Sequence, residues 1–199
     1  MITKNLIVDI LIKDAQQKAL ALFFQKEIVE KDTISPVIHK GMYFITICTH
    51  KRQPIFGKIV GAGLAPAQKE LSEIGMIACK QRIKIPKRFN NIELDEFVIM
   101  PNRIHGIIVI YNPEPSFGQP QGLPLRKTLG EIVGAYKSLV AAECLKIYKN
   151  NNIMMGKFWQ RNVYEHIIWN EESYSKIAQY IISGPTKWEL DPLYIKETR

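Results

Sequence analysis

Residues 93–110, ELDEFVIMPNRIHGIIVI, decide the fold of this chain. The segments 94–100 and 104–111 are rich in β-branched and other apolar residues, which predicts two strands. Pro101 and Asn102 form a turn-forming pair between them. Strands that are joined by so short a turn run antiparallel, so this stretch predicts an antiparallel pair.

Further strands and helices are predicted on both sides of this pair. Strands are expected at 41–49 and 158–168, and helices at 71–83, from 128 onwards, and at 171–183. The last helix ends at Gly184 and Pro185, a combination that stops helices. Residues 57–67 are rich in Gly, Ala and Pro, which predicts a loop. The order predicts an α+β fold, a ferredoxin-like antiparallel sheet with helices packed on one face.

The N-terminal segment differs from the rest of the chain in charge. Residues 1–35 contain five Lys and five Asp or Glu, so the net charge of +8 belongs to residues 36–199. Residues 4–31 have apolar residues at helical spacing. We therefore predict an N-terminal helical extension over 1–38 and one domain over 39–199. The basic excess of that domain favours a polyanionic partner, and a merely solvated basic surface is the alternative.

The composition also predicts the compartment. The three cysteines are widely spaced in apolar surroundings, which favours buried thiols in a reducing cytosol over disulfides. No apolar run is long enough to span a bilayer, and the first residues lack a signal-peptide pattern. We expect a cytoplasmic protein without a membrane partner, as a monomer or a homodimer.

Alternation along the strand at 104–111 places Arg103 and His105 on one face and Ile104 on the other. A His-apolar-His pattern would hold one divalent ion on an exposed sheet face, but here only His105 is present. A lone histidine on a strand is more often a hydrogen-bonded structural residue than a metal ligand. Tyr180, at the edge of the apolar stripe of the last helix, is either a packing residue or a nucleophile that attacks phosphorus.

Five strings, in order, resemble the REP-associated tyrosine transposases of the HUH single-strand endonuclease superfamily. The resemblance runs from about Gly41 to Leu190 and rests on FITICTHKR (44–52), ELDEFVIMPNRIHGIIVI (93–110), LGEIVGAYKS (129–138), FWQRNVYEHII (158–168) and AQYIISGP (178–185). It implies a ferredoxin-like fold and cleavage of single-stranded DNA beside a hairpin. It further implies a tyrosine that becomes joined to the 5′ phosphate, and a Mg²⁺ or Mn²⁺ ion.

By position, the resemblance assigns His105 to the second histidine of the HUH motif and Tyr180 to the nucleophile. His166 matches a histidine that is common after Trp-Gln-Arg, a possible active-site neighbour without an assigned role. Arg103 stands where the family has the first histidine, and Gly184 where it has an asparagine that completes the metal site. Arginine is a permanent cation and glycine has no side chain, so one of three expected ligands remains.

These departures leave two main hypotheses. In the first, the protein cleaves and rejoins strands, with Arg103 binding the scissile phosphate. In the second, it is an inactive DNA-binding protein, a repressor or recruitment factor. A ferredoxin-like RNA-binding module ranks last, because the strand at 104–110 offers no aromatic residues.

The expected partner is single-stranded or hairpin DNA. Besides Arg103, the candidate DNA contacts are Lys51, Arg52, Lys137 and Arg161. Arg161 lies among Phe158, Trp159 and Tyr164, aromatic residues that can stack on unpaired bases or pack in the core.

Overall fold

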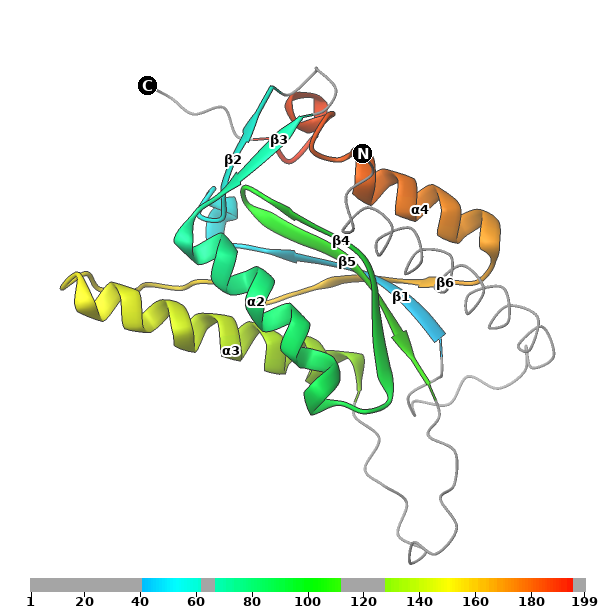
Figure 1. Ribbon diagram of the computed structural model, residues 1–199, viewed down its shortest axis with the longest axis horizontal. Helices are drawn as coiled ribbons and strands as arrows, with labels where there is room; N and C mark the ends of the chain where they lie inside the picture. The colour runs from blue at the N-terminus through cyan, green and yellow to red at the C-terminus, as the bar shows by residue number, and fades with distance from the viewer. Residues whose placement is uncertain (1–40, 62–66, 112–127, 195–199) are drawn as a thin grey trace, which may run out of the picture.

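The computed structural model describes residues 41–61, 67–111 and 128–194, and its centre is one four-stranded sheet (Figure 1). The sheet contains β1 (Gly41–Cys48), β4 (Ile92–Met100), β5 (Arg103–Ile110) and β6 (Tyr164–Ile168) in the order β4-β5-β1-β6. All neighbouring strands are antiparallel, which confirms the predicted α+β class with an antiparallel sheet. The N-terminal extension predicted over 1–38 lies outside the described residues, so that boundary stays a prediction.

Two helices cover one face of the sheet. They are α2 (Glu73–Arg88) and α3 (Leu129–Asn150), which lie on the same side in Figure 1. Ser72 caps α2 by accepting from the backbone N–H of Gly75, and Thr128 and Glu131 form the predicted capping box of α3. Their apolar faces pack on alternate residues of the central strands, among them Ile45, Ile47, Ile99, Ile104, Ile108 and Ile110.

The third helix, α4 (Glu171–Ser183), covers the opposite face, so the prediction that the helices pack on one face was wrong. Ile181 of α4 packs with Met42, Phe44, Val98, Ile107 and Val109. The physical reason is the strand composition, because every residue of β5 is buried. A strand that is apolar at both odd and even positions needs cover on both faces of the sheet.

The segment predicted as a loop over 57–67 contains part of a hairpin instead. Strands β2 (Gly57–Val60) and β3 (Gln68–Leu71) pair antiparallel in a second, two-stranded sheet. Lys58 and Glu70 face each other across it, with their charged atoms 2.9 Å apart. The hairpin is largely exposed and polar, so it lacks the apolar alternation by which strands are predicted.

The strand predicted over 158–168 is shorter than expected. Only Tyr164–Ile168 forms β6, and the preceding residues are linked to β1 by a single bridge between Thr49 and Trp159. Phe158 is buried, and Phe56 packs against both Phe158 and Trp159. These two aromatic side chains therefore belong to the core, and of the three proposed as stacking residues only Tyr164 is exposed.

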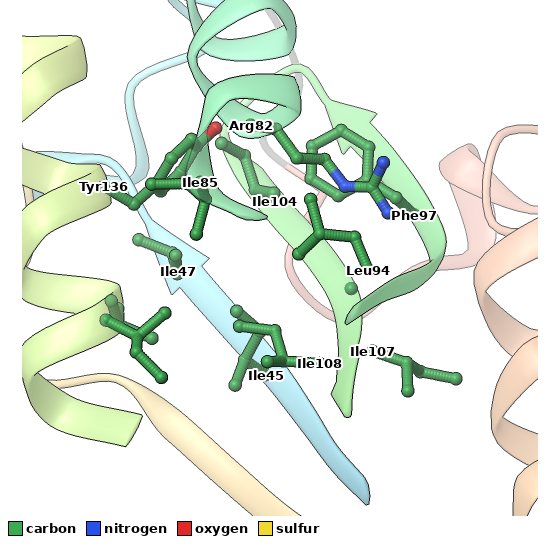
Figure 2. A pocket seen from close by; sticks show the side chains of 13 residues that line it. Ile45, Ile47, Arg82, Ile85, Leu94, Phe97, Ile104, Ile107, Ile108 and Tyr136 are labelled. Atoms are coloured by element: carbon green, nitrogen blue, oxygen red, sulfur yellow. The ribbon is translucent and has the colours of Figure 1, made fainter. Parts of the chain in front are cut away.

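A small apolar pocket lies between the sheet and the helices α2 and α3 (Figure 2). Isoleucines of β1 and β5 line it, and Arg82 stacks over the ring of Phe97 at its side, 4.3 Å from the ring centroid. The Tyr136 hydroxyl donates to the carbonyl of Ala78, and burial raises the pKa of Tyr136. We interpret the pocket as a packing gap of the core, because nearly all of its lining is apolar.

Within the described ranges, no helix combines the length and the apolar character needed to cross a membrane.

Candidate nucleic-acid site at one end of the sheet

One end of the sheet gathers most of the residues that the sequence singled out. In the strand register, Cys48 pairs with Arg103, and Thr46 lies between His105 on one side and Tyr164 on the other. Helix α4 crosses this face and places Tyr180 beside His105. Residues distant in sequence thus converge at the end of β1, the start of β5 and the start of β6.

The side chain of Arg103 is fixed by contacts with four other residues of this site. Its Nε donates to Nε2 of His105 at 2.8 Å, and its Nη1 donates to Oδ1 of Asn102 at 3.0 Å. Its Nη2 forms an ion pair with Asp191, and the guanidinium lies 5.1 Å from the ring centroid of Trp188. Arg103 is 1% exposed and His105 is 3% exposed, so the expectation of an open sheet face was wrong. Helix α4 and the C-terminal segment with η2 (Trp188–Leu190) cover this face.

The hydrogen bonds determine the tautomer of His105. A guanidinium can only donate, so Nε2 of His105 accepts from Arg103. Nδ1 therefore carries the proton and donates to Oγ1 of Thr46, 2.8 Å away. Phe44 stacks on the imidazole, with ring centroids 5.6 Å apart and planes 17° from parallel. Burial, with the nearby Arg103 charge, lowers the pKa of His105 from 6.5 to about 3, so the ring is neutral near pH 7.

The lowered pKa of His105 predicts acid destabilisation. Below pH 6.5 the imidazole of His105 is protonated in the unfolded chain, whereas in the folded protein it stays neutral down to about pH 3. The His105 contribution to the free energy of unfolding is thus complete above pH 6.5 and is lost as the pH falls. In His105→Gln, which keeps an acceptor and a donor, the loss between pH 7 and 4.5 should be smaller by about 2 kcal/mol. Urea unfolding at the two pH values measures this, and an equal loss in both proteins would contradict it.

The residues of this site do not fit a Mg²⁺ or Mn²⁺ ion. The lone pair of His105 Nε2, the one that would face a metal, already accepts from Arg103, and a fixed cation repels another. Gly184 contributes no ligand. In the described part of the chain, no three His, Cys, Asp or Glu side chains are grouped to hold a metal. A guanidinium thus lies beside His105 and occupies the lone pair of its Nε2.

Tyr180 lies at the rim of the site. Its ring contacts His105 and Phe44, with centroids 5.3 and 6.1 Å away, and the residue is 45% exposed. Its hydroxyl is 3.5 Å from Nε2 of His105, whose lone pair Arg103 occupies, so His105 does not serve as its base. A Cβ on Gly184 would lie 3.7 Å from Sδ of Met100, the strand partner of Arg103, so position 184 also borders the site.

Two of the predicted DNA contacts form a turn after β1. Lys51 and Arg52 are exposed in η1 (His50–Arg52), and both adopt left-handed backbone conformations with φ of 51° and 56°. The N–H of His50 donates to Phe158 and that of Arg52 to Thr49, which hold the turn. Such conformations are costly for residues other than glycine and concentrate at functional sites.

Lys137 holds a loop, and that loop carries Arg161. The ammonium of Lys137 donates to the carbonyls of Gln160 at 2.7 Å and Arg161 at 3.3 Å, and Nε1 of Trp159 donates to the carbonyl of Lys137. Burial lowers the pKa of Lys137. The predicted DNA contact at Lys137 is thus engaged with the protein, whereas Arg161 is exposed.

Three positively charged side chains influence the thiol of Cys48, the last residue of β1. Arg103, Arg52 and Lys137 all lower the pKa of the Cys48 thiol, although burial raises it by a larger amount. His166 is exposed on β6 opposite Phe44 in the strand register, on the same face as Tyr164. The site is therefore a buried Arg103–His105 pair with a basic and aromatic rim.

Sequence reasoning missed three residues that build this site. Thr46 orients His105, while Asp191 and Trp188 surround Arg103. Thr46 had a signal, because it is a polar residue inside the apolar strand FITIC and shares the face of Phe44. The other two had none, since they lie in a short C-terminal segment without regular periodicity.

Comparison with known proteins supports the architecture. An uncharacterized protein of Haemophilus influenzae is 36% identical to this chain over 165 residues, covering 78% of this chain and 86% of that protein. The structure of a REP-associated tyrosine transposase bound to a REP hairpin superposes with a TM-score of 0.52 at 15% identity. The match covers 84% of this chain and 92% of the transposase, and it shows a shared fold. No protein-family model matches the chain.

Proposed function

This chain belongs to the same family as the uncharacterized Haemophilus influenzae protein, and we propose that it binds single-stranded or hairpin DNA without a metal ion and without cutting it. The observation that carries this proposal is the guanidinium of Arg103, which uses the metal-facing nitrogen of His105 and is itself neutralised by Asp191. The resemblance to the HUH enzymes implies a Mg²⁺ or Mn²⁺ ion for strand cleavage, and a guanidinium bound to His105 opposes the binding of such a cation.

The surroundings of the site favour a nucleic acid as the partner. Lys51, Arg52 and Arg161 are exposed on two neighbouring turns, and the backbone hydrogen bond from His50 to Phe158 ties these turns together. Clustered cations attract phosphates and release counterions on binding. The transposase with the same fold is bound to a hairpin, which makes a hairpin the first DNA to test.

We expect the protein to bind a fluorescent DNA hairpin in the presence of EDTA, with affinity that falls steeply as salt rises. Each of the variants Arg52→Ala and Arg161→Ala should lower the slope of log K against log salt by about 0.9 or less, because each removes one phosphate contact. Fluorescence anisotropy across a salt series measures both quantities.

The matched control is Lys87→Ala, which removes an exposed cation from the last turn of α2, beside the start of β4 and at the opposite end of that strand from Met100. It should leave the slope unchanged. If all three variants lower the slope equally, binding depends on net charge alone and the proposed site is wrong. If EDTA abolishes hairpin binding, the metal-free part of the proposal is wrong.

A second candidate function is strand transfer by Tyr180, favoured by its place at the rim of the site, where the residue is 45% exposed and its hydroxyl lies 3.5 Å from Nε2 of His105. The tyrosine hydroxyl would lose its proton, its oxygen would form a bond to the phosphorus of the 5′ phosphate, and the bond from phosphorus to the 3′ oxygen would break, so that the 3′ oxygen takes up a proton and leaves as a hydroxyl. A covalent protein–DNA adduct that disappears in Tyr180→Phe would establish this function and overturn the non-catalytic one. The absence of an adduct with a bound hairpin would exclude it.

A further inference from the structure

Tyr164 is an exposed aromatic residue at the start of strand β6. It is the first residue of that strand, it pairs with Thr46 in the register, and it is 60% exposed. Thr46 in turn pairs with His105 on its other side. Tyr164 therefore lies in line with His105 across the sheet, with Thr46 of β1 between them.

Phe44 connects Tyr164 to Tyr180. The ring centroids of Tyr164 and Phe44 are 6.2 Å apart, and those of Tyr180 and Phe44 are 6.1 Å apart, both in edge-to-face geometry. Phe44 is 8% exposed, whereas the two tyrosines are each exposed by nearly half or more. Two exposed phenol rings thus flank one buried ring on the face that carries Arg103 and His105.

We propose that Tyr164 is the stacking platform for an unpaired base of the DNA strand that flanks the hairpin. This inference rests on the proposed DNA binding and assigns a position to the single-stranded part of the ligand. The ring of Tyr164 contacts the buried Phe44 and still leaves the residue 60% exposed, and an exposed aromatic ring can stack on the flat π-face of a base. Arg161, three residues earlier and exposed, supplies the charge for the adjoining phosphate.

The chemistry favours a nucleic acid over an apolar protein segment on this surface. Arg161 lies three residues before Tyr164, and the backbone hydrogen bond from His50 to Phe158 joins the turn that contains Lys51 and Arg52 to the segment that leads into β6. His166, on the same face of β6, is polar and exposed. A surface that combines separate aromatic rings with cations matches alternating bases and phosphates of a single strand.

The test compares two hairpins with the same stem, one blunt and one carrying a short single-stranded extension with the fluorescent base 2-aminopurine. We expect the protein to bind the extended hairpin more tightly and to quench its fluorescence. Tyr164→Ala should weaken binding of the extended hairpin roughly tenfold and leave the blunt hairpin unaffected, because one stacked base is lost. Tyr164→Phe, which keeps the ring, should retain both the affinity and the quenching.

The matched control is Trp169→Ala, since Trp169 is 70% exposed and follows the other end of β6. The assignment of Tyr164 would be overturned if Trp169→Ala lost as much affinity for the extended hairpin as Tyr164→Ala does. It would also be overturned if Tyr164→Ala still preferred the extended hairpin over the blunt one. A protein that binds both hairpins equally would also overturn it while leaving the proposed DNA binding intact. If neither hairpin binds, the proposed function and the platform both fail.

Discussion

Replacing Asp191 by alanine should destabilise the protein by about 3–5 kcal/mol, because it leaves the guanidinium of Arg103 buried without a counter-charge. Arg103 is 1% exposed, and the side chain of Asp191 is 10% exposed. The carboxylate also accepts from the backbone N–H of Leu193, whose carbonyl accepts from Asn102. Because Asn102 accepts from Arg103 as well, a closed ring of hydrogen bonds would lose one member. Urea unfolding at pH 7 measures the loss.

A second variant keeps this prediction testable if Asp191→Ala fails to fold. In Arg103→Met with Asp191→Leu, both charges are absent, and apolar groups of similar size fill the space. Most of the stability should return, since a buried ion pair adds little over good apolar packing. Glu172→Ala, which breaks the exposed pair with Lys176, should leave the unfolding midpoint unchanged. If Asp191→Ala has the same unfolding midpoint as this control, the Arg103–Asp191 pair does not stabilise the fold and the prediction is wrong.

The double variant Arg103→His with Gly184→Asn should bind Mn²⁺, whereas the natural protein should not. Removing the guanidinium returns the lone pair of His105 Nε2, and the new asparagine stands beside Met100, the strand partner of the new histidine. Once Arg103 no longer neutralises it, the carboxylate of Asp191 attracts a positive ion to this space. Isothermal titration calorimetry measures binding directly, and the unfolding temperature of the double variant alone should rise with Mn²⁺.

The two single variants are the controls for this experiment. Gly184→Asn keeps Arg103 on His105, so it should not bind the ion. Arg103→His lacks one ligand and should bind more weakly than the double variant. Position 184 has φ of −50° and ψ of −47°, which any residue adopts, so the asparagine introduces no backbone strain. Mn²⁺ binding by the natural protein would contradict the conclusion that Arg103 takes the place of the ion.

The strands that form the sheet were predictable because their signals are local. The segments 41–49, 94–100 and 104–111 correspond to β1, β4 and β5, each with its strand composition inside one short window. The hairpin of β2 and β3 was not predictable, because paired charges such as Lys58 and Glu70 stabilise it in place of an apolar stripe. The face chosen by α4 depends on which side of the sheet stays uncovered, a property of the assembled fold.

In the candidate site, too, some features follow from local sequence patterns and others depend on the assembled fold. Strand alternation correctly placed Arg103 and His105 on one face, and helical spacing correctly placed Tyr180 at the edge of α4. The burial of these strand residues was not foreseen, because the cover comes from α4 and from Trp188. The contacts of Lys137 were not foreseen either, since its ammonium donates to the carbonyl of Gln160, which lies 23 residues further along the chain.

The sequence by itself determined the order of the strands of the main sheet and of the helices between them, the basic character of residues 36–199, and the place of His105 and Tyr180 on their strand and helix, since each of these depends on neighbours along the chain. Only the tertiary structure decided what Arg103 does. Its partner Asp191 lies 88 residues away in sequence, and the orientation of His105 depends on Thr46, which lies 59 residues before it. A charge buried between such distant segments has no signature in either segment alone, because its energy depends on which groups surround it after folding.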